Sequence, residues 1–317
     1  MKKMMSTCVA LICAIGAFIS LRWLTKSRED TDWRDAAKPG KLINVDGVGL
    51  HFVEAGNGPP IIMIHGFGGQ TFSFRYQMAE FARDHRCVAI DLKGFGYSER
   101  SDGGDYSLVE QARLALRAMD ELGIDKAVLI GHSMGGEVVA RVAEMAPERV
   151  EKLVLVATAP GYPLWLGPRL PFMRAFLPGF ARLARRNARK NLFFDPKSVD
   201  LDAIMAEYEK PGRIYGSLNT VWQMWRDVRK QPKIDHAKIT MPVLILWGEK
   251  ERVLPFDQRL LRWLRKRLPQ AEVVTIPRTG HMLLEESPTA ANEALRRFLG
   301  ERAAPVGDKT AVRAARS

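Results

Sequence analysis

A serine between two glycines is the residue of this sequence best suited to covalent chemistry. The run Gly131-His132-Ser133-Met134-Gly135 follows a short apolar stretch, 127–130, and opens an amphipathic one, 134–146. A Gly-x-Ser-x-Gly run between a strand and a helix is typical of a nucleophile elbow, where small neighbours leave room for a strained, exposed serine. Negative charge that develops at a helix N-terminus is also favoured. The pattern predicts that Ser133 attacks a substrate carbonyl.

A histidine near the C-terminal end is the candidate base. His281 lies in Thr279-Gly280-His281-Met282, soon after an apolar run that ends at Ile276. Imidazole is the side chain whose pKa best suits reversible proton transfer near neutral pH. We expect His281 to accept the proton of Ser133 and later to activate water. Glu286, which follows shortly afterwards, is expected to cap the last helix and to take no part in chemistry.

Short apolar runs supply the strands that must position these residues. Two alternating runs flank Asp46-Gly47, a strong hairpin signal, so the domain is expected to open with an antiparallel hairpin over 41–54. Unbroken apolar runs further along are typical of strands buried on both faces of a parallel sheet. These runs are Ile61–Ile64, Val88–Ile90, Ala127–Ile130, Leu153–Val156, Val243–Leu246 and Val273–Ile276.

Helical stretches separate these runs. Ser107 and Glu110 have the spacing of a capping box, and a helix is expected to follow them as far as Gly123. Further helices are expected over 134–146, 255–268 and 288–299. The alternation of strand and helix predicts an α/β fold with a doubly wound, mostly parallel sheet.

One long interval breaks the alternation and divides the chain. No core strand is expected between Val156 and Val243, so we predict a helical cap over 160–235, inserted between core segments 41–159 and 236–300. Residues 26–40 are expected to form a linker, and residues 301–317 a disordered basic tail.

The N-terminal segment is predicted to meet a membrane. Residues 4–21 form an uncharged segment of 18 residues. This length is just enough for a helix to cross about 30 Å of hydrocarbon. We expect residues 1–25 to be a retained single-pass anchor. The alternative is a cleaved signal peptide that would leave a secreted or periplasmic protein. The flanking charges do not decide which face carries the catalytic domain.

The charge and the cysteines narrow the function classes. The 317 residues carry a net charge of +12, and the stretch 164–194 has seven basic residues and no acidic one, mixed with bulky apolar side chains. This mixture suits an anionic lipid surface, or else the solvated face of a lid helix. No nucleic-acid module surrounds it, so no nucleic-acid partner is expected. Cys87 has no partner in the expected soluble part and is predicted to be buried.

Four motifs in order resemble the α/β-hydrolase family across residues 42–299. They are His65-Gly66-Phe67-Gly68-Gly69, Asp91–Ser98, the run around Ser133, and Gly280-His281. The resemblance implies that the backbone N–H groups of Phe67 and Met134 form an oxyanion hole, each donor supplying about 3 to 4 kcal/mol of transition-state stabilisation. It implies structural roles for His65, His132 and Asp91, with His65 bracing its loop and Asp91 its turn.

Two glutamates are candidates for the acid of the triad. The resemblance places an acid after the strand at 243–246, where the sequence reads Gly248-Glu249-Lys250-Glu251. Glu251 aligns with that position, and Glu249 is the alternative. A glutamate can orient an imidazole as an aspartate does, although its extra methylene requires a different backbone placement.

A serine at position 133 limits the reactions that the fold could catalyse. A serine argues against epoxide hydrolases and haloalkane dehalogenases of this fold, which place an aspartate there. The expected reaction is hydrolysis of a carboxylic ester by a carboxylesterase or lipase-like enzyme, with an apolar or aromatic small-molecule substrate suggested by the aromatic cap and no metal or organic cofactor. A carbon-carbon bond hydrolase remains an alternative, as does a non-catalytic ligand-binding member.

Overall fold

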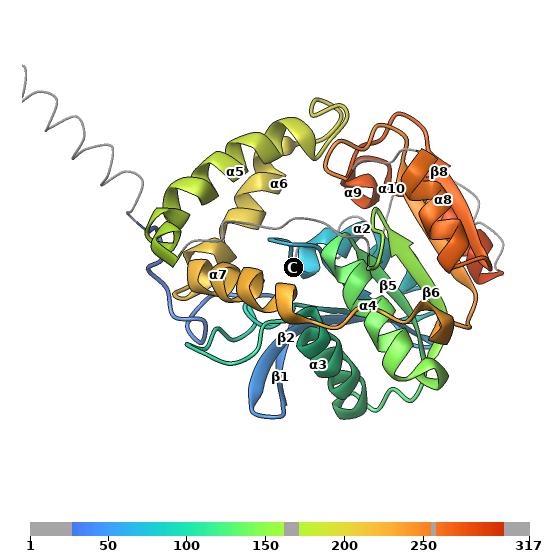
Figure 1. The fold of residues 1–317 in the computed structure, drawn as a ribbon, viewed down its shortest axis with the longest axis horizontal. Coiled ribbons are helices and arrows are strands. Elements are labelled where there is room, and N and C mark those ends of the chain that lie inside the picture. The colour runs from blue at the N-terminus through green and yellow to red at the C-terminus, as the bar shows by residue number, and fades with distance from the viewer. Residues whose placement is uncertain (1–26, 162–170, 255–257, 301–317) are drawn as a thin grey trace, which may run out of the picture.

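A computed structural model describes residues 27–161, 171–254 and 258–300. They form an eight-stranded sheet in the order β1-β2-β4-β3-β5-β6-β7-β8 (Figure 1). β2 pairs antiparallel with β1 and β4, and every other neighbouring pair is parallel, so the predicted doubly wound, mostly parallel sheet is confirmed. The strands are β1 (Lys41–Val45), β2 (Val48–Ala55), β3 (Pro60–Ile64), β4 (Arg86–Ile90), β5 (Ala127–His132), β6 (Val150–Val156), β7 (Val243–Gly248) and β8 (Ala271–Ile276).

The burial of the strands can be compared with the expectation from the apolar runs. Every residue of the central strands β5 and β7 is buried, as expected for strands covered on both faces. In β8 only Ile276 is buried. The expectation of full burial is wrong for β8 because it is an edge strand, with a neighbour on one side only.

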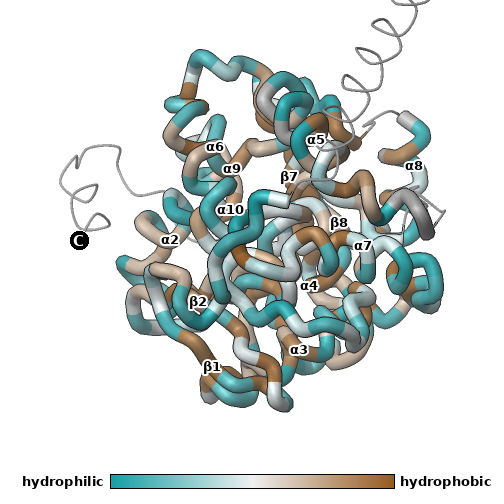
Figure 2. Tube along the Cα trace, turned by 90° about the vertical axis from the view of Figure 1, so that its left-hand side faces the viewer, coloured by the Kyte–Doolittle hydropathy of each residue, from teal (hydrophilic) through white to brown (hydrophobic). Residues whose placement is uncertain are grey.

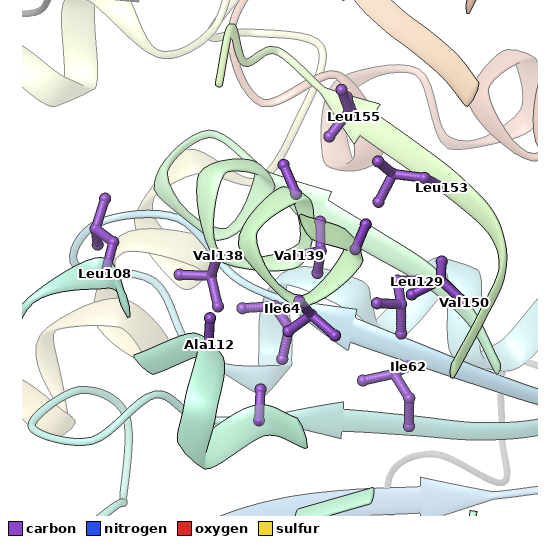
Figure 3. Close-up of a cluster of buried hydrophobic side chains, with 14 of the residues drawn as sticks. Ile62, Ile64, Leu108, Ala112, Leu129, Val138, Val139, Val150, Leu153 and Leu155 are labelled. Atoms are coloured by element: carbon purple, nitrogen blue, oxygen red, sulfur yellow. The ribbon is translucent and has the colours of Figure 1, made fainter. Parts of the chain in front are cut away.

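Helices cover both faces of the sheet. α3 (Leu108–Glu121), α4 (Met134–Met145) and α8 (Gln258–Arg267) pack on one face, and α2 (Arg75–Phe81) and α10 (Pro288–Leu299) on the other. Figure 3 shows Val138 and Val139 of α4 over Ile64 and Leu129 of the strands beneath. This packing fixes α4, and therefore its first turn, on the sheet.

Two local predictions can be compared with the structure. The Ser107 side chain accepts a hydrogen bond from the Glu110 N–H at 3.2 Å, but the Glu110 carboxylate binds Arg113, so only half of the expected capping box forms. Cys87 is buried in β4 as predicted. Desolvation raises the pKa of its thiol to about 12, which keeps it protonated and unreactive near neutral pH.

The cap is helical and is fastened to the core. Between β6 and β7 the chain forms α5 (Leu177–Asn191), α6 (Leu201–Glu209) and α7 (Ser217–Asp227), which make an arc beside the sheet in Figure 1. The Tyr208 hydroxyl of α6 donates to the buried Glu285 carboxylate of α9 (Leu283–Glu286) at 2.5 Å, and Arg75 of α2 binds the same carboxylate. The cap is thus joined to the helices of the core through Glu285.

The described part of the expected linker lies along the cap. Thr31 forms a parallel bridge with Ile214, and Asp30 forms an ion pair with Arg213. α7 begins after Gly216, which has no capping side chain, and the Glu29 carboxylate instead accepts the Leu218 N–H at 2.7 Å. This segment is therefore held by specific contacts.

The predicted membrane anchor, residues 1–25, and the predicted tail, residues 301–317, lie outside the described residues. Among the helices that the structure does describe, none combines the length and apolarity needed to cross a bilayer.

Candidate active site

Ser133 occupies a strained bend between β5 and α4. Its φ of 51° and ψ of −118° are far from the regions that a non-glycine residue prefers, and its N–H donates to the Val156 carbonyl at 2.8 Å. A Cβ on Gly131 would lie 2.3 Å from the Gly135 carbonyl oxygen, and a Cβ on Gly135 2.2 Å from the Ile64 oxygen. Both glycines of the motif are therefore required by close backbone approach, and the bend leaves Ser133 partly exposed.

His281 is paired with Glu251. Its Nδ1 donates to Glu251 Oε2 at 2.6 Å, and the two side chains are only 5% and 1% exposed. The second carboxylate oxygen accepts the N–H groups of Val253 and Leu254, so both oxygens are held by hydrogen bonds. With the proton on Nδ1, the neutral imidazole keeps Nε2 free to accept a proton.

Glu249 has a different position. Its carboxylate accepts the Arg278 N–H at 3.0 Å and contacts Lys250, and the backbone bond from Arg278 is the main reason that its pKa is lowered. Its own N–H donates to the Ile276 carbonyl. Of the two acids left open by the sequence, the structure therefore places Glu251 on His281, while Glu249 helps to tie the acid loop to the histidine loop.

His132 joins the nucleophile turn to the histidine loop. Its Nε2 donates to the His281 carbonyl at 3.0 Å, and the two rings lie 4.8 Å apart. Burial, together with the neighbouring His281, lowers the pKa of His132 to about 3. His132, which directly precedes Ser133, is thus a neutral donor. It holds the backbone of His281 next to the turn that carries Ser133. This contact agrees with the structural role expected for His132.

The expected oxyanion loop lies next to the nucleophile. A Cβ on Gly66 would be 3.0 Å from the Ser133 Cβ. Among the described residues, the N–H groups of Phe67 and Met134 have no hydrogen-bond acceptor. β3 and β5 are adjacent where the strand order reverses, which is where ligands bind in open α/β sheets. Both amides are therefore available to an oxygen at this switch point.

Two buried polar residues support that loop, as expected from the sequence. His65 donates from Nδ1 to the Gly66 carbonyl and accepts the Leu92 N–H through Nε2, and burial lowers its pKa. Asp91 accepts the N–H groups of Thr71 at 2.6 Å and Tyr97 at 2.8 Å. Asp91 therefore stabilises its turn.

Glu286 differs from its prediction. α10 begins after Ser287 with no side-chain cap, and the Glu286 carboxylate binds elsewhere. It accepts the Gly280 N–H at 2.6 Å and the Asp195 N–H at 2.7 Å. The predicted helix cap is wrong because the carboxylate binds these two amides instead, and Asp195, 91 residues away in the sequence, comes within reach only in the folded chain.

The site is thus a serine, a histidine and a buried carboxylate with two backbone donors nearby. Such a set can carry out acyl transfer without further groups. Across residues 27–161, 171–254 and 258–300, no cluster of three or more His, Cys, Asp or Glu side chains is arranged to hold a metal ion.

Comparison with known proteins identifies the family. A family model described as the alpha/beta hydrolase fold matches residues 59–288, so the chain belongs to the α/β-hydrolase family. It is 32% identical over 266 residues to the dihydrolipoyllysine-residue acetyltransferase component of the acetoin cleaving system of Pseudomonas putida, covering 80% of this chain and 68% of that one. It is 30% identical over 258 residues to haloalkane dehalogenase 2 of Mycobacterium tuberculosis, covering 75% and 87%.

A solved structure adds to this likeness. The 2-hydroxy-6-oxo-6-phenylhexa-2,4-dienoate hydrolase of Rhodococcus sp. strain RHA1 is similar with a TM-score of 0.68 and 25% identity, covering 83% of this chain and 100% of that one. These relatives have different named reactions, so the particular reaction of this chain must be argued from its own site.

The pairing of His281 with Glu251 yields a test of the acid. Glu251→Gln should lower kcat on the order of 10³- to 10⁴-fold, because an amide at this position favours the wrong imidazole tautomer. Glu249→Gln, the matched control, should cost far less because its side chain does not touch His281. Steady-state kinetics with an activated ester would measure both, and equal losses in the two variants would contradict the assignment.

The low pKa of His132 predicts a pH dependence of stability. Because the unfolded chain binds a proton near pH 6.5 and the folded chain only near pH 3, stability falls as the pH decreases through this window. The loss from this group should reach about 2 kcal/mol at about pH 5. His132→Gln keeps a donor near the His281 carbonyl but does not titrate, so urea unfolding at pH 7.5 and 5 should show a smaller pH effect. An equal pH effect in both proteins would contradict the prediction.

Proposed function

We propose that this α/β-family hydrolase is a serine hydrolase that cleaves a carboxylic ester through an acyl-enzyme. The observation that carries the proposal is the His281–Glu251 pair at 2.6 Å, positioned by His132 beside the strained Ser133. The strained serine provides the nucleophile, and the paired imidazole provides a base with Nε2 available.

The reaction follows from these positions. As His281 Nε2 takes the hydroxyl proton, Ser133 Oγ bonds to the ester carbon, and the carbonyl electron pair moves to the oxygen. The N–H groups of Phe67 and Met134 would bind that oxyanion. Collapse of the intermediate breaks the ester C–O bond, and His281 returns the proton to the leaving alcohol. Water, deprotonated by His281, then cleaves the acyl-enzyme and releases the acid and Ser133.

The acyl group is proposed to be apolar or aromatic. Phe67 is 48% exposed on the loop beside Ser133 and contacts Phe95 edge-on at 5.8 Å. On the cap side, Met282 follows the base directly and packs with Phe193 in a small apolar cluster. These apolar side chains near Ser133 and His281 support the proposal of an apolar acyl group.

A second candidate is cleavage of a carbon-carbon bond. The similarity to the Rhodococcus hydrolase of a phenylhexadienoate favours it. The residue after the base, often tryptophan in such hydrolases, is Met282 here, which favours the ester. Dehalogenation fits less well, because the elbow carries Ser133 and dehalogenases of this fold use an aspartate there.

Removal of the nucleophile or the base tests the reaction class. Fluorophosphonate probes label an activated serine, so wild type should label, and Ser133→Ala and His281→Ala should not. Ester turnover should fall on the order of 10⁶-fold in both variants. Persistent labelling of Ser133→Ala would contradict the assignment, whereas hydrolysis of a ring-cleavage product but of no p-nitrophenyl ester would favour the carbon-carbon reaction.

We further propose that the protein works at a membrane, through a retained anchor in residues 1–25 and a second contact through α5. This helix has five basic residues and no acidic one. Phe180 (40%) and Leu183 (53%) are exposed on the same helix, and Figure 2 shows apolar segments among the hydrophilic ones along α5. Basic groups around exposed apolar side chains fit an anionic lipid surface.

The lipid contact can be separated from the anchor. A chain that starts at Ser27 should sediment with vesicles rich in phosphatidylglycerol and much less with neutral phosphatidylcholine vesicles. Replacing Phe180 and Leu183 by Ser should weaken binding by at least about tenfold, because two apolar insertions are lost. Met145→Ser is the control. It removes a similarly exposed apolar side chain (44%) from α4, away from the cap, and should leave vesicle binding unchanged. Equal binding to both lipids would contradict the proposal.

A further inference from the structure

The loop that carries His281 is bonded directly to the base of the cap. The Met282 N–H donates to the Leu192 carbonyl at 3.0 Å, immediately after the last turn of α5. On the other side of His281, a Cβ on Gly280 would lie 2.7 Å from the Phe194 nitrogen. Only a glycine permits this approach, so the histidine loop and the segment 192–195 lie backbone against backbone.

Glu286 bridges these two segments. One carboxylate oxygen accepts the Gly280 N–H at 2.6 Å and the other accepts the Asp195 N–H at 2.7 Å. Charged acceptors make shorter and stronger hydrogen bonds than neutral ones. A glutamine at this position has a single acceptor oxygen, so it can satisfy only one of the two amides.

The bridge is distinct from the acid of the triad. Glu251 holds the ring of His281 through Nδ1, and His132 holds its carbonyl. Glu286 binds the N–H of Gly280, the residue before His281, and connects it to Asp195 at the base of the cap. The backbone around His281 is thus held by His132, and Glu286 links it to Asp195 of the cap.

We propose that Glu286 is a positioning residue that couples the placement of His281 to the cap. Its carboxylate makes the end of α5 and the histidine loop one mechanical unit, so a displaced cap displaces the base. This inference rests on the proposed serine hydrolase function. The bridge binds backbone amides and not the side chains proposed to flank the substrate, so its loss should act on kcat more than on KM.

The test uses two variants of the full chain and a control. Glu286→Gln and Glu286→Ala should lower kcat in that order, up to on the order of 10²-fold for alanine, with KM changed by less than about threefold. Glu293→Gln, an exposed glutamate on α10, is the control and should match wild type. Fluorophosphonate labelling rates should fall in parallel, because they report the activation of Ser133 without turnover.

Hydrogen exchange measures the bridge itself. In Glu286→Ala, peptides that contain the Gly280 and Asp195 amides should exchange faster, while the core strands keep wild-type protection and thereby show that the variant is folded. Faster exchange with unchanged kcat would overturn the positioning role, and unchanged exchange would overturn the bridge. A wild type that neither labels nor hydrolyses esters would overturn the hydrolase function and with it the positioning role of Glu286, while the exchange data would still report the contact.

Discussion

Close approach of backbone at the β5–α4 bend is the constraint on which the site depends. Gly135 contacts the end of β3 so closely that a Cβ would lie 2.2 Å from the Ile64 oxygen, and Ser133 takes a φ of 51°. Such strain costs of order 1–3 kcal/mol and persists only where surrounding packing over-determines it. The buried valines of α4 and the fully buried β5 provide that packing. The apolar core thus holds Ser133, the proposed nucleophile, in a partly exposed, unfavourable geometry.

The other reacting groups are placed by cross-links between loops. The acid loop bonds to the histidine loop through Lys250 N–H and the Thr279 carbonyl at 2.9 Å, and His132 connects the histidine loop to the nucleophile turn. These loops all follow carboxyl ends of parallel strands, so the topology brings them to one edge of the sheet. Short hydrogen bonds then fix their relative positions, which strand packing alone leaves loose.

Sequence patterns predicted the parts that depend on local rules. All six apolar runs are strands in the structure, and the predicted helix at 288–299 coincides with α10. Buried parallel strands and the residues that start and end helices have strong local sequence signals. Glu286 shows where local reasoning ends. Its position just before Ser-Pro predicted a helix cap, but its partners include Asp195, 91 residues away in the sequence. Neither hydropathy period nor motif spacing encodes such a contact.

The cap could be predicted from the sequence, but the contacts that attach it to the core could not. Its existence follows from the gap between β6 and β7, yet its attachment depends on dispersed polar contacts, such as Tyr208 to Glu285 and Glu29 to the start of α7. Each contact joins the cap to a different part of the chain. Leu192, which directly follows α5, also accepts the Met282 N–H, so the C-terminal end of α5 is linked by one hydrogen bond to the residue after His281. Packing of the cap and placement of His281 are therefore coupled in this structure.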